Sequence, residues 1–150
     1  AEADAHYADL TIIAVCTGPG NFTGARIGVA AARGLALSTG ATAIGLDRFE
    51  VAVGETNGAG CVRLDGRGGA SHMALFKGGV LSKPAETVQA GSEAEYADDF
   101  PILSVGRIDL AALAALAGKR IAAGEVTRPA PRYLKPANAA LPREAPPEIL

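Results

Sequence analysis

The fold of this chain is decided by Thr17-Gly18-Pro19-Gly20-Asn21-Phe22-Thr23-Gly24-Ala25-Arg26-Ile27-Gly28-Val29-Ala30. An apolar run over 10–16 precedes this stretch, and a long apolar segment that ends near Gly40 follows it. A strand, a glycine-rich turn and a helix in this order form half of an α/β unit. Glycines at this density indicate special backbone dihedrals, or a backbone very close to another group. We therefore predict a structural turn made by Gly18, Pro19, Gly20 and Gly24.

The same turn allows a phosphate-binding interpretation, because a helix N-terminus offers free N–H groups and the positive end of a dipole. Gly18 and Gly20 fit the dinucleotide fingerprint, but the third glycine falls at Gly24, one position late. In this interpretation Asp47 would contact a ribose. No Lys-Ser or Lys-Thr follows Gly24, and Pro19 lacks an N–H, so the Walker pattern does not match. A small nucleotide-binding enzyme with Gly18–Gly24 as its phosphate loop remains the alternative function.

The composition indicates a globular domain with a core of small side chains. The 150 residues are 49% apolar, contain no tryptophan and are 5% aromatic, so packing depends on close backbone approach. A net charge of −2 argues against a broad surface for nucleic-acid phosphates. A local basic patch is conceivable in the proline-rich tail, although such a tail is more often a solvated surface. Its members would be Arg128, Arg132, Lys135 and Arg143.

Enzyme chemistry is hard to build from the residues present. His6 and His72 are the two histidines, and neither forms a His-x-x-x-His or His-Glu-x-x-His pair for zinc. Cys16 and Cys61 make neither a disulfide framework nor a metal motif. We predict no catalytic residue, no metal and no cofactor, and we expect His72 to lie on a strand surface. There is no long charge-free apolar run and no basic-then-apolar leader, so a cytoplasmic protein without a membrane segment is expected.

A coarse assignment of elements gives an α/β organisation. Thr23 is the expected N-cap of the first helix and Gly40 its stop, and residues 56–60 are the expected hinge. We divide the chain into 1–57, the remainder of an N-terminal lobe, and 58–150, a C-terminal lobe with a proline-rich tail. The predicted strands are 10–16, 41–46, 61–64, 72–76 and 102–105, and the predicted helices are 22–38, 48–55, 84–89 and 109–122.

The helix after the turn carries stripes of small residues that allow close approach of another backbone. One part of its surface must pack on its own sheet. Another part, around Arg26, Val29, Ala30, Arg33 and Leu37, is a candidate partner surface. The alternative is that every apolar position on this helix belongs to the core.

Three motifs in this chain resemble those of one family. The stretch from Gly18 to Ala30, continuing through Arg33-Gly34-Leu35-Ala36, closely resembles the signature of the TsaB family, and the Ile44-Gly45 strand before Asp47 continues the likeness. Leu64-Asp65-Gly66-Arg67 is similar to a weakened form of the family's Asp-Ala-Arg strand end. Pro131-Arg132-Tyr133-Leu134-Lys135 is similar to its Pro-x-Tyr-Leu-Arg tail.

Two departures from the family pattern stand out. Family members begin with a strand that carries an Asp-Thr-Ser type motif, two more strands and a helix, whereas this chain starts at Ala1 without them. The expectation is therefore a fragment with an incomplete N-terminal lobe. Residues 68–72 replace the family's Gly-Glu-Val-Tyr, so no role is carried over to them.

The resemblance implies the two-lobed actin-like fold, shared with hexokinase and the Hsp70 chaperones. It also implies a non-catalytic scaffold, in spite of the family's glycoprotease-like label. Such a scaffold supports the catalytic subunit TsaD, which forms threonylcarbamoyladenosine in tRNA. A TsaE-type ATPase joins the complex, tRNA is met only through the complex, and a homodimer of similar geometry forms without TsaD. The implied interface residues are Phe22, Arg26, Val29, Ala30, Arg33 and Leu37.

Overall fold

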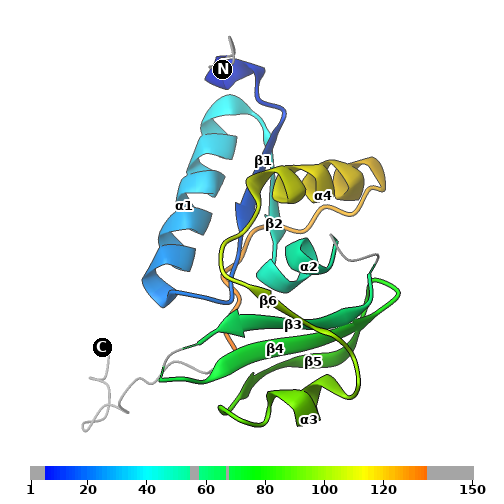
Figure 1. The fold of residues 1–150 in the computed structure, drawn as a ribbon. Coiled ribbons are helices and arrows are strands. Elements are labelled where there is room, and N and C mark those ends of the chain that lie inside the picture. The colour runs from blue at the N-terminus through cyan, green and yellow to red at the C-terminus, as the bar shows by residue number, and fades with distance from the viewer. Residues whose placement is uncertain (1–5, 55–57, 67, 135–150) are drawn as a thin grey trace, which may run out of the picture.

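Two β-sheets, each packed against helices, make up the described part of the chain (Figure 1). The computed structural model describes residues 6–54, 58–66 and 68–134. The smaller sheet contains two strands and the larger one four. The mixed α/β architecture expected from the sequence is confirmed.

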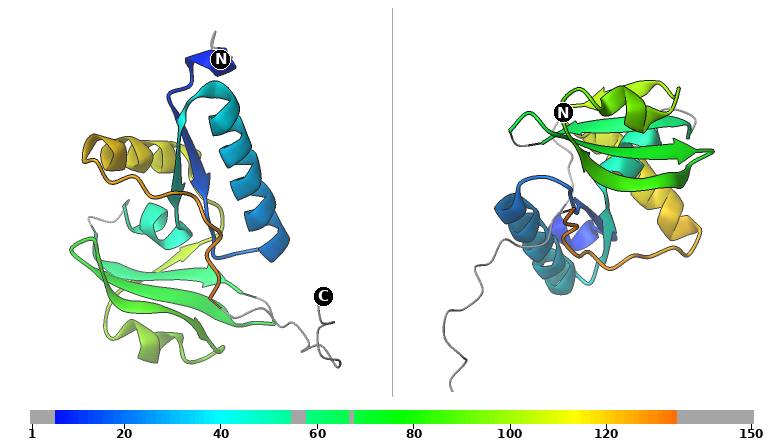
Figure 2. Two further views of the ribbon diagram at one scale, coloured as in Figure 1. Left: turned by 180° about the vertical axis from the view of Figure 1, so that it is seen from behind. Right: turned by 90° about the horizontal axis from the view of Figure 1, so that it is seen from below.

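The smaller sheet is a parallel pair, β1 (Ile12–Cys16) and β2 (Thr42–Leu46), with Cys16 opposite Leu46. Parallel strands need a crossover connection, and α1 (Phe22–Thr39) supplies it. A short 3₁₀ helix, η1 (Tyr7–Asp9), precedes β1. Helix α1 covers one face of this sheet, and α4 (Leu110–Ala122) covers the other (Figures 1 and 2).

The larger sheet has the strand order β5-β4-β3-β6. The pair β3–β6 is parallel, and the pairs β3–β4 and β4–β5 are antiparallel. Its two faces carry short helices, α2 (Arg48–Val53) and α3 (Glu93–Ala97). The strands are β3 (Gly60–Asp65), β4 (Ser71–Lys77), β5 (Val80–Val88) and β6 (Ile102–Val105).

Helix α2 joins the cores of the two sheets. Phe49 is fully buried and packs with Val62 and Leu64 of β3. Val51 belongs to the other cluster, with Ile44 of β2 and Leu113 of α4. The capping box at the start of α2 fixes this short helix, because the Asp47 carboxylate accepts from the Glu50 N–H and the Glu50 carboxylate accepts from the Asp47 N–H.

Three sequence-based assignments need correction. The helix predicted at Pro84–Gln89 is wrong, because these residues continue β5 as far as Val88. Pro84 is tolerated there because β5 is an edge strand. Thr23 is not the N-cap of α1, since Asn21 accepts the Gly24 N–H at 3.0 Å. Third, no helix was predicted at Glu93–Ala97, where the structure has α3.

The division into lobes at residues 57 and 58 stays a prediction. Residues 56 and 57 of the expected hinge lie outside the described residues, and its last residue, Gly60, already begins β3. Helix α4 follows this boundary in sequence, yet it packs on β1 and β2 of the smaller sheet. Residues 126–134 also return to that sheet: the Gly45 N–H of β2 donates to the Thr127 carbonyl at 3.0 Å.

Candidate functional site

The glycine-rich turn lies against the chain's own backbone. Gly18 has φ +107°, and a Cβ built on it would lie 3.1 Å from the carbonyl oxygen of Arg132. The Arg132 N–H donates to the Thr17 carbonyl at 2.8 Å, and the Arg48 N–H donates to the Gly18 carbonyl at 2.8 Å. The close approach that the glycines indicated is therefore made by residues 48 and 132 of the same chain.

Two of the groups that the phosphate-loop alternative needs are bound by the protein itself. The Gly24 N–H at the start of α1 is bound by the Asn21 side chain. Asp47 is 6% exposed, accepts from the Glu50 N–H at 2.8 Å, and forms an ion pair with Arg132. A ribose hydroxyl at Asp47 would have to displace one of these contacts. The geometry therefore argues against this alternative.

Five of the six predicted partner-binding residues lie on the exposed side of α1, and one does not. Val29 is a correction: it is 3% exposed and shares the buried stripe of α1 with Ala32 and Ala36. The helical repeat turns this stripe toward β1 and β2, so Val29 offers no surface to a partner. The exposed residues of the predicted set are Phe22, Arg26, Ala30, Arg33 and Leu37.

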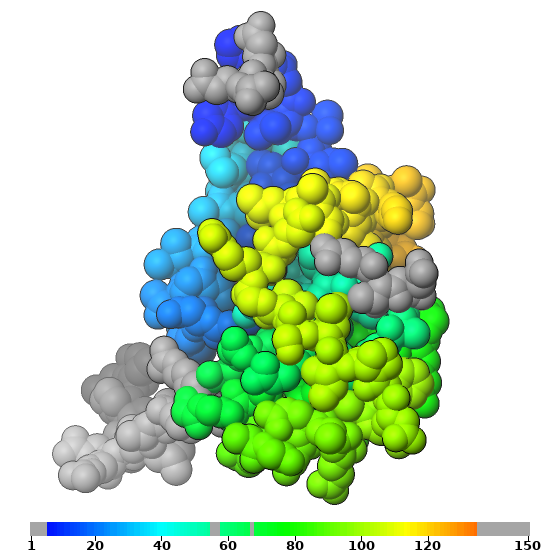
Figure 3. Space-filling view, in the orientation of Figure 1, coloured from blue at the N-terminus to red at the C-terminus, as the bar shows by residue number. Residues whose placement is uncertain are grey.

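The exposed surface of α1 extends beyond the predicted set. Ile27 and Leu35 are exposed, at 64% and 44%, with Ala31 between them. Their spacing of four residues was the available signal, because it places them on one side of a helix. We define the outer face of α1 as Ile27, Ala30, Ala31, Gly34 and Leu37. In Figure 3 no described segment covers the side of α1 that is in view.

An aromatic cluster closes the N-terminal end of this surface. The rings of Phe22 and Tyr133 have their centroids 4.7 Å apart. Arg26 places its Cζ atom 3.8 Å from the Phe22 centroid, and its Nε donates to the Tyr133 hydroxyl at 2.7 Å. The signature helix and the Pro-Arg-Tyr-Leu segment therefore meet, and sequence reasoning did not anticipate the contact.

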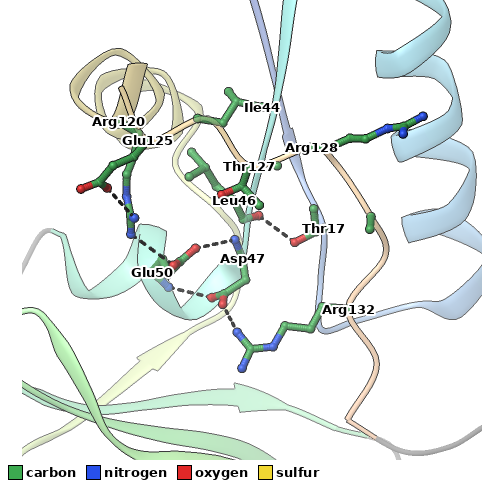
Figure 4. A pocket seen from close by; sticks show the side chains of 12 residues that line it. Thr17, Ile44, Leu46, Asp47, Glu50, Arg120, Glu125, Thr127, Arg128 and Arg132 are labelled. Carbon is green, nitrogen blue, oxygen red and sulfur yellow. Dashed lines mark hydrogen bonds and ion pairs between the residues drawn. The ribbon is translucent and has the colours of Figure 1, made fainter. Parts of the chain in front are cut away.

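A charged pocket lies between β2, α2, α4 and the segment after α4 (Figure 4). Its volume is about 260 Å³. Arg120 pairs with Glu50 at 3.2 Å and with Glu125 at 2.8 Å, and Arg132 pairs with Asp47. Burial raises the pKa of the Asp47 carboxyl, although the Glu50 N–H and Arg132 act in the opposite direction. These carboxylates and guanidinium groups bind one another, so the ion pairs connect α2 and its N-cap to α4 and to the segment after α4.

The remaining sequence-predicted residues are placed as follows. Asp65 pairs with Arg63 at 3.2 Å, and Arg67 lies outside the described residues. His72 is on β4, with its Nδ1 3.1 Å from the Thr87 hydroxyl of β5. Arg128 is exposed, whereas Lys135 and Arg143 of the predicted basic patch lie outside the described residues.

Two searches of the described residues bear on other kinds of site. In that part of the chain no group of three or more His, Cys, Asp and Glu side chains could hold a metal ion. None of the helices that the structure describes combines the length and apolar character needed to span a lipid bilayer.

Comparison with known proteins gives one family and one fold. A family model described as TsaD, tRNA N6-adenosine threonylcarbamoyltransferase, matches residues 1–97. No curated protein matches the chain. A structure from Pseudomonas aeruginosa, described as an uncharacterized protein with similarity to peptidase YEAZ, aligns with a TM-score of 0.66 and 21% identity over 87% of this chain and 76% of that one. YeaZ from Pseudomonas aeruginosa aligns with a TM-score of 0.61 and 21% identity over 86% and 76%. The chain has the actin-like α/β fold of these structures.

Proposed function

This chain belongs to the TsaD family, and from that premise we propose that it is a non-catalytic scaffold subunit that binds a TsaD-type catalytic subunit. The family match and the fold of YeaZ, which is a TsaB protein, support a part in the biosynthesis of threonylcarbamoyladenosine in tRNA. The scaffold role itself is our proposal. The likeness to the TsaB family in sequence motifs supports it.

The observation that carries the proposal is the uncovered outer face of α1. The helix has 18 residues, of which Val29, Ala32 and Ala36 are buried. The outer face exposes apolar side chains, including Ile27 and Leu37, and Arg26 and Arg33 border it. An exposed apolar patch with a polar border is typical of protein–protein interfaces. Small residues such as Ala30 and Gly34 allow a partner helix to approach the backbone closely.

The charged residues support a structural role for the rest of the site. Asp47 and Glu50 cap α2 and pair with arginines from two other segments. A general acid or base must instead reach a substrate atom. We therefore expect no protease or transferase activity from this chain alone.

The further expectations belong to the same proposal. A TsaE-type ATPase joins through the complex, tRNA is contacted only through the catalytic subunit, and α1 pairs with α1 of a second copy when that subunit is absent. The complex works in the cytoplasm and needs no cofactor bound to this chain.

The test is complex formation with a TsaD-type subunit, followed by size exclusion and native mass spectrometry. Ala30→Glu buries a charge in the proposed contact and should weaken binding by about a hundredfold. Ala115→Glu is the matched control, because Ala115 is exposed on α4, and it should bind like wild type. If Ala30→Glu and Ala115→Glu bound the catalytic subunit equally well, α1 would not be part of the interface. Saturable ATP binding by the chain alone would instead support the phosphate-loop alternative.

A further inference from the structure

Residues 126–134 form a strap that connects the charged pocket to the start of α1. The strap leaves α4 and runs along β2 without forming a helix or strand (Figure 2). Its Thr127 carbonyl accepts the Gly45 N–H, and Pro129 is fully buried. A Cβ at Gly45 would lie 2.9 Å from the Pro129 Cα. The strap is therefore fitted closely to the smaller sheet.

Arg132 is fixed through both its backbone and its side chain. Its N–H donates to the Thr17 carbonyl at 2.8 Å, next to the glycine-rich turn. Its guanidinium pairs with Asp47, which the Glu50 N–H holds in turn. The side chain of Asp47 is 8% exposed, so the pair is partly shielded from water.

Tyr133 follows directly and turns to α1. It stacks on Phe22 and accepts a hydrogen bond from Arg26. Phe22 and Tyr133 both remain 41% exposed, so each ring still offers area to another molecule. Arg132 and Tyr133 are neighbours in sequence, so the contacts that hold Arg132 lie next to the aromatic cluster.

We propose that Arg132 is a positioning residue that holds Tyr133 in the partner surface, where Phe22, Arg26 and Tyr133 form its aromatic end. This inference rests on the proposed function, because the partner is the catalytic subunit named there. Helix α1 carries Arg26 and Arg33 and no acidic residue. No carboxylate in the described part of the chain pairs with either arginine. Both guanidinium groups are therefore available to pair with a carboxylate of the partner.

The inference is tested with five variants and two measurements. The first measurement is the affinity for the catalytic subunit, and the second is the NMR shift of the Phe22 ring protons in the free chain, which the stacked Tyr133 ring determines. The variants are Tyr133→Ala, Tyr133→Phe, Arg132→Gln, Arg132→Lys and the control Arg128→Gln, which changes an exposed arginine of the same strap.

Tyr133→Ala should weaken binding by about tenfold or more, since it removes an aromatic side chain from the interface. Tyr133→Phe keeps the ring and loses the hydrogen bond from Arg26, which lies within this chain, so it should weaken binding by no more than about fivefold. Arg132→Gln should move the Phe22 resonances and weaken binding by about tenfold. Arg132→Lys keeps a positive charge for Asp47 and should restore most of the affinity. Arg128→Gln should change neither measurement.

Two results would overturn the inference while the proposed function survives. Unchanged Phe22 shifts in Arg132→Gln would mean that the ion pair does not position Tyr133. Unchanged affinity in Tyr133→Ala, with binding still lost in Ala30→Glu, would place Tyr133 outside the partner surface. Failure of the wild-type chain to bind the catalytic subunit overturns the proposed function, and the assignment of Tyr133 to that surface falls with it.

Discussion

The two sheets of this molecule are stabilised in different ways. The larger sheet buries its central strands between helices, and Cys61, Val62, Leu64, Met73 and Ala74 are fully enclosed. In the smaller sheet every residue of β1 is only partly buried, and α1 keeps most of its surface exposed. An apolar cluster around Ile44 and Leu113 packs one face of this sheet, and the strap and the ion pairs add specific contacts. The larger sheet is therefore enclosed by apolar packing on both faces, whereas the smaller sheet combines one apolar cluster with these contacts and leaves the outer face of α1 exposed.

The largest expected difference comes from the same substitution made in each region. Phe49→Ala removes a fully buried ring from the larger core and should lower the free energy of unfolding by about 3–5 kcal/mol. Phe22→Ala removes a ring that is exposed on α1 and should cost less than about 1.5 kcal/mol. Urea denaturation of both variants measures the contrast. Similar losses would show that the two regions do not differ in this way.

A second pair of variants tests how closely the strap is fitted. In Gly45→Ala the new Cβ would lie 2.8 Å from a Thr17 methyl carbon and 2.9 Å from the Pro129 Cα. The backbone of the strap must shift, at a cost of about 1–3 kcal/mol.

Gly34→Ala is the matched control, since nothing lies within 4 Å of its Cβ. It should stabilise α1 by about 0.5–1 kcal/mol. Thermal unfolding compares the two, and a neutral Gly45→Ala would mean that the strap is loosely held.

A third prediction concerns the charge in the pocket. Burial raises the pKa of Asp47, so the native chain holds a proton at pH values where the unfolded chain has released it. The stability of wild type relative to Asp47→Asn should then fall as the pH rises from the ordinary aspartate pKa through the raised one. Denaturation of both proteins across this range measures the difference. If the stability of wild type relative to Asp47→Asn rose with pH instead, the ion pair with Arg132 would have a larger effect on the pKa of Asp47 than burial has.

The smallest effect is expected on the outer face of α1. Leu37 is 87% exposed, so Leu37→Ala should change the free energy of unfolding by less than about 0.5 kcal/mol. Leu113→Ala on the buried side of α4 should cost about 2–4 kcal/mol. Denaturant midpoints distinguish the two. A large loss from Leu37→Ala would show that the outer face contributes to the fold.

The order of elements in the smaller sheet was predictable because its signals are local. An apolar run gives β1, the glycine-rich turn gives the start of α1, and Gly40 ends the helix in the left-handed conformation. Asp47 followed by Glu50 is a capping box that could have been recognised in the sequence. The length of β5 was not predictable in the same way, because Pro84 usually ends a strand and only its place at the sheet edge permits it.

The candidate site was predicted less well because its contacts join distant residues. Arg26 and Tyr133 are 107 positions apart, and Asp47 and Arg132 are 85 apart. No local pattern encodes such pairings. Val29 was misplaced for a different reason: α1 has small or apolar residues on every side, so its hydrophobic period does not single out the buried stripe.

The strap also determines when the molecule can be finished during synthesis. A chain emerges from the ribosome N-terminus first, and contacts of high sequence separation form last. The antiparallel pairs β3–β4 and β4–β5 join neighbours within a short stretch of chain, so this part of the larger sheet can assemble before the strap is made. The hydrogen bond from the Arg132 N–H to the Thr17 carbonyl, just after β1, forms only after residue 132 has been made. The surface proposed for the partner is thus complete only once nearly all of the described chain has been translated.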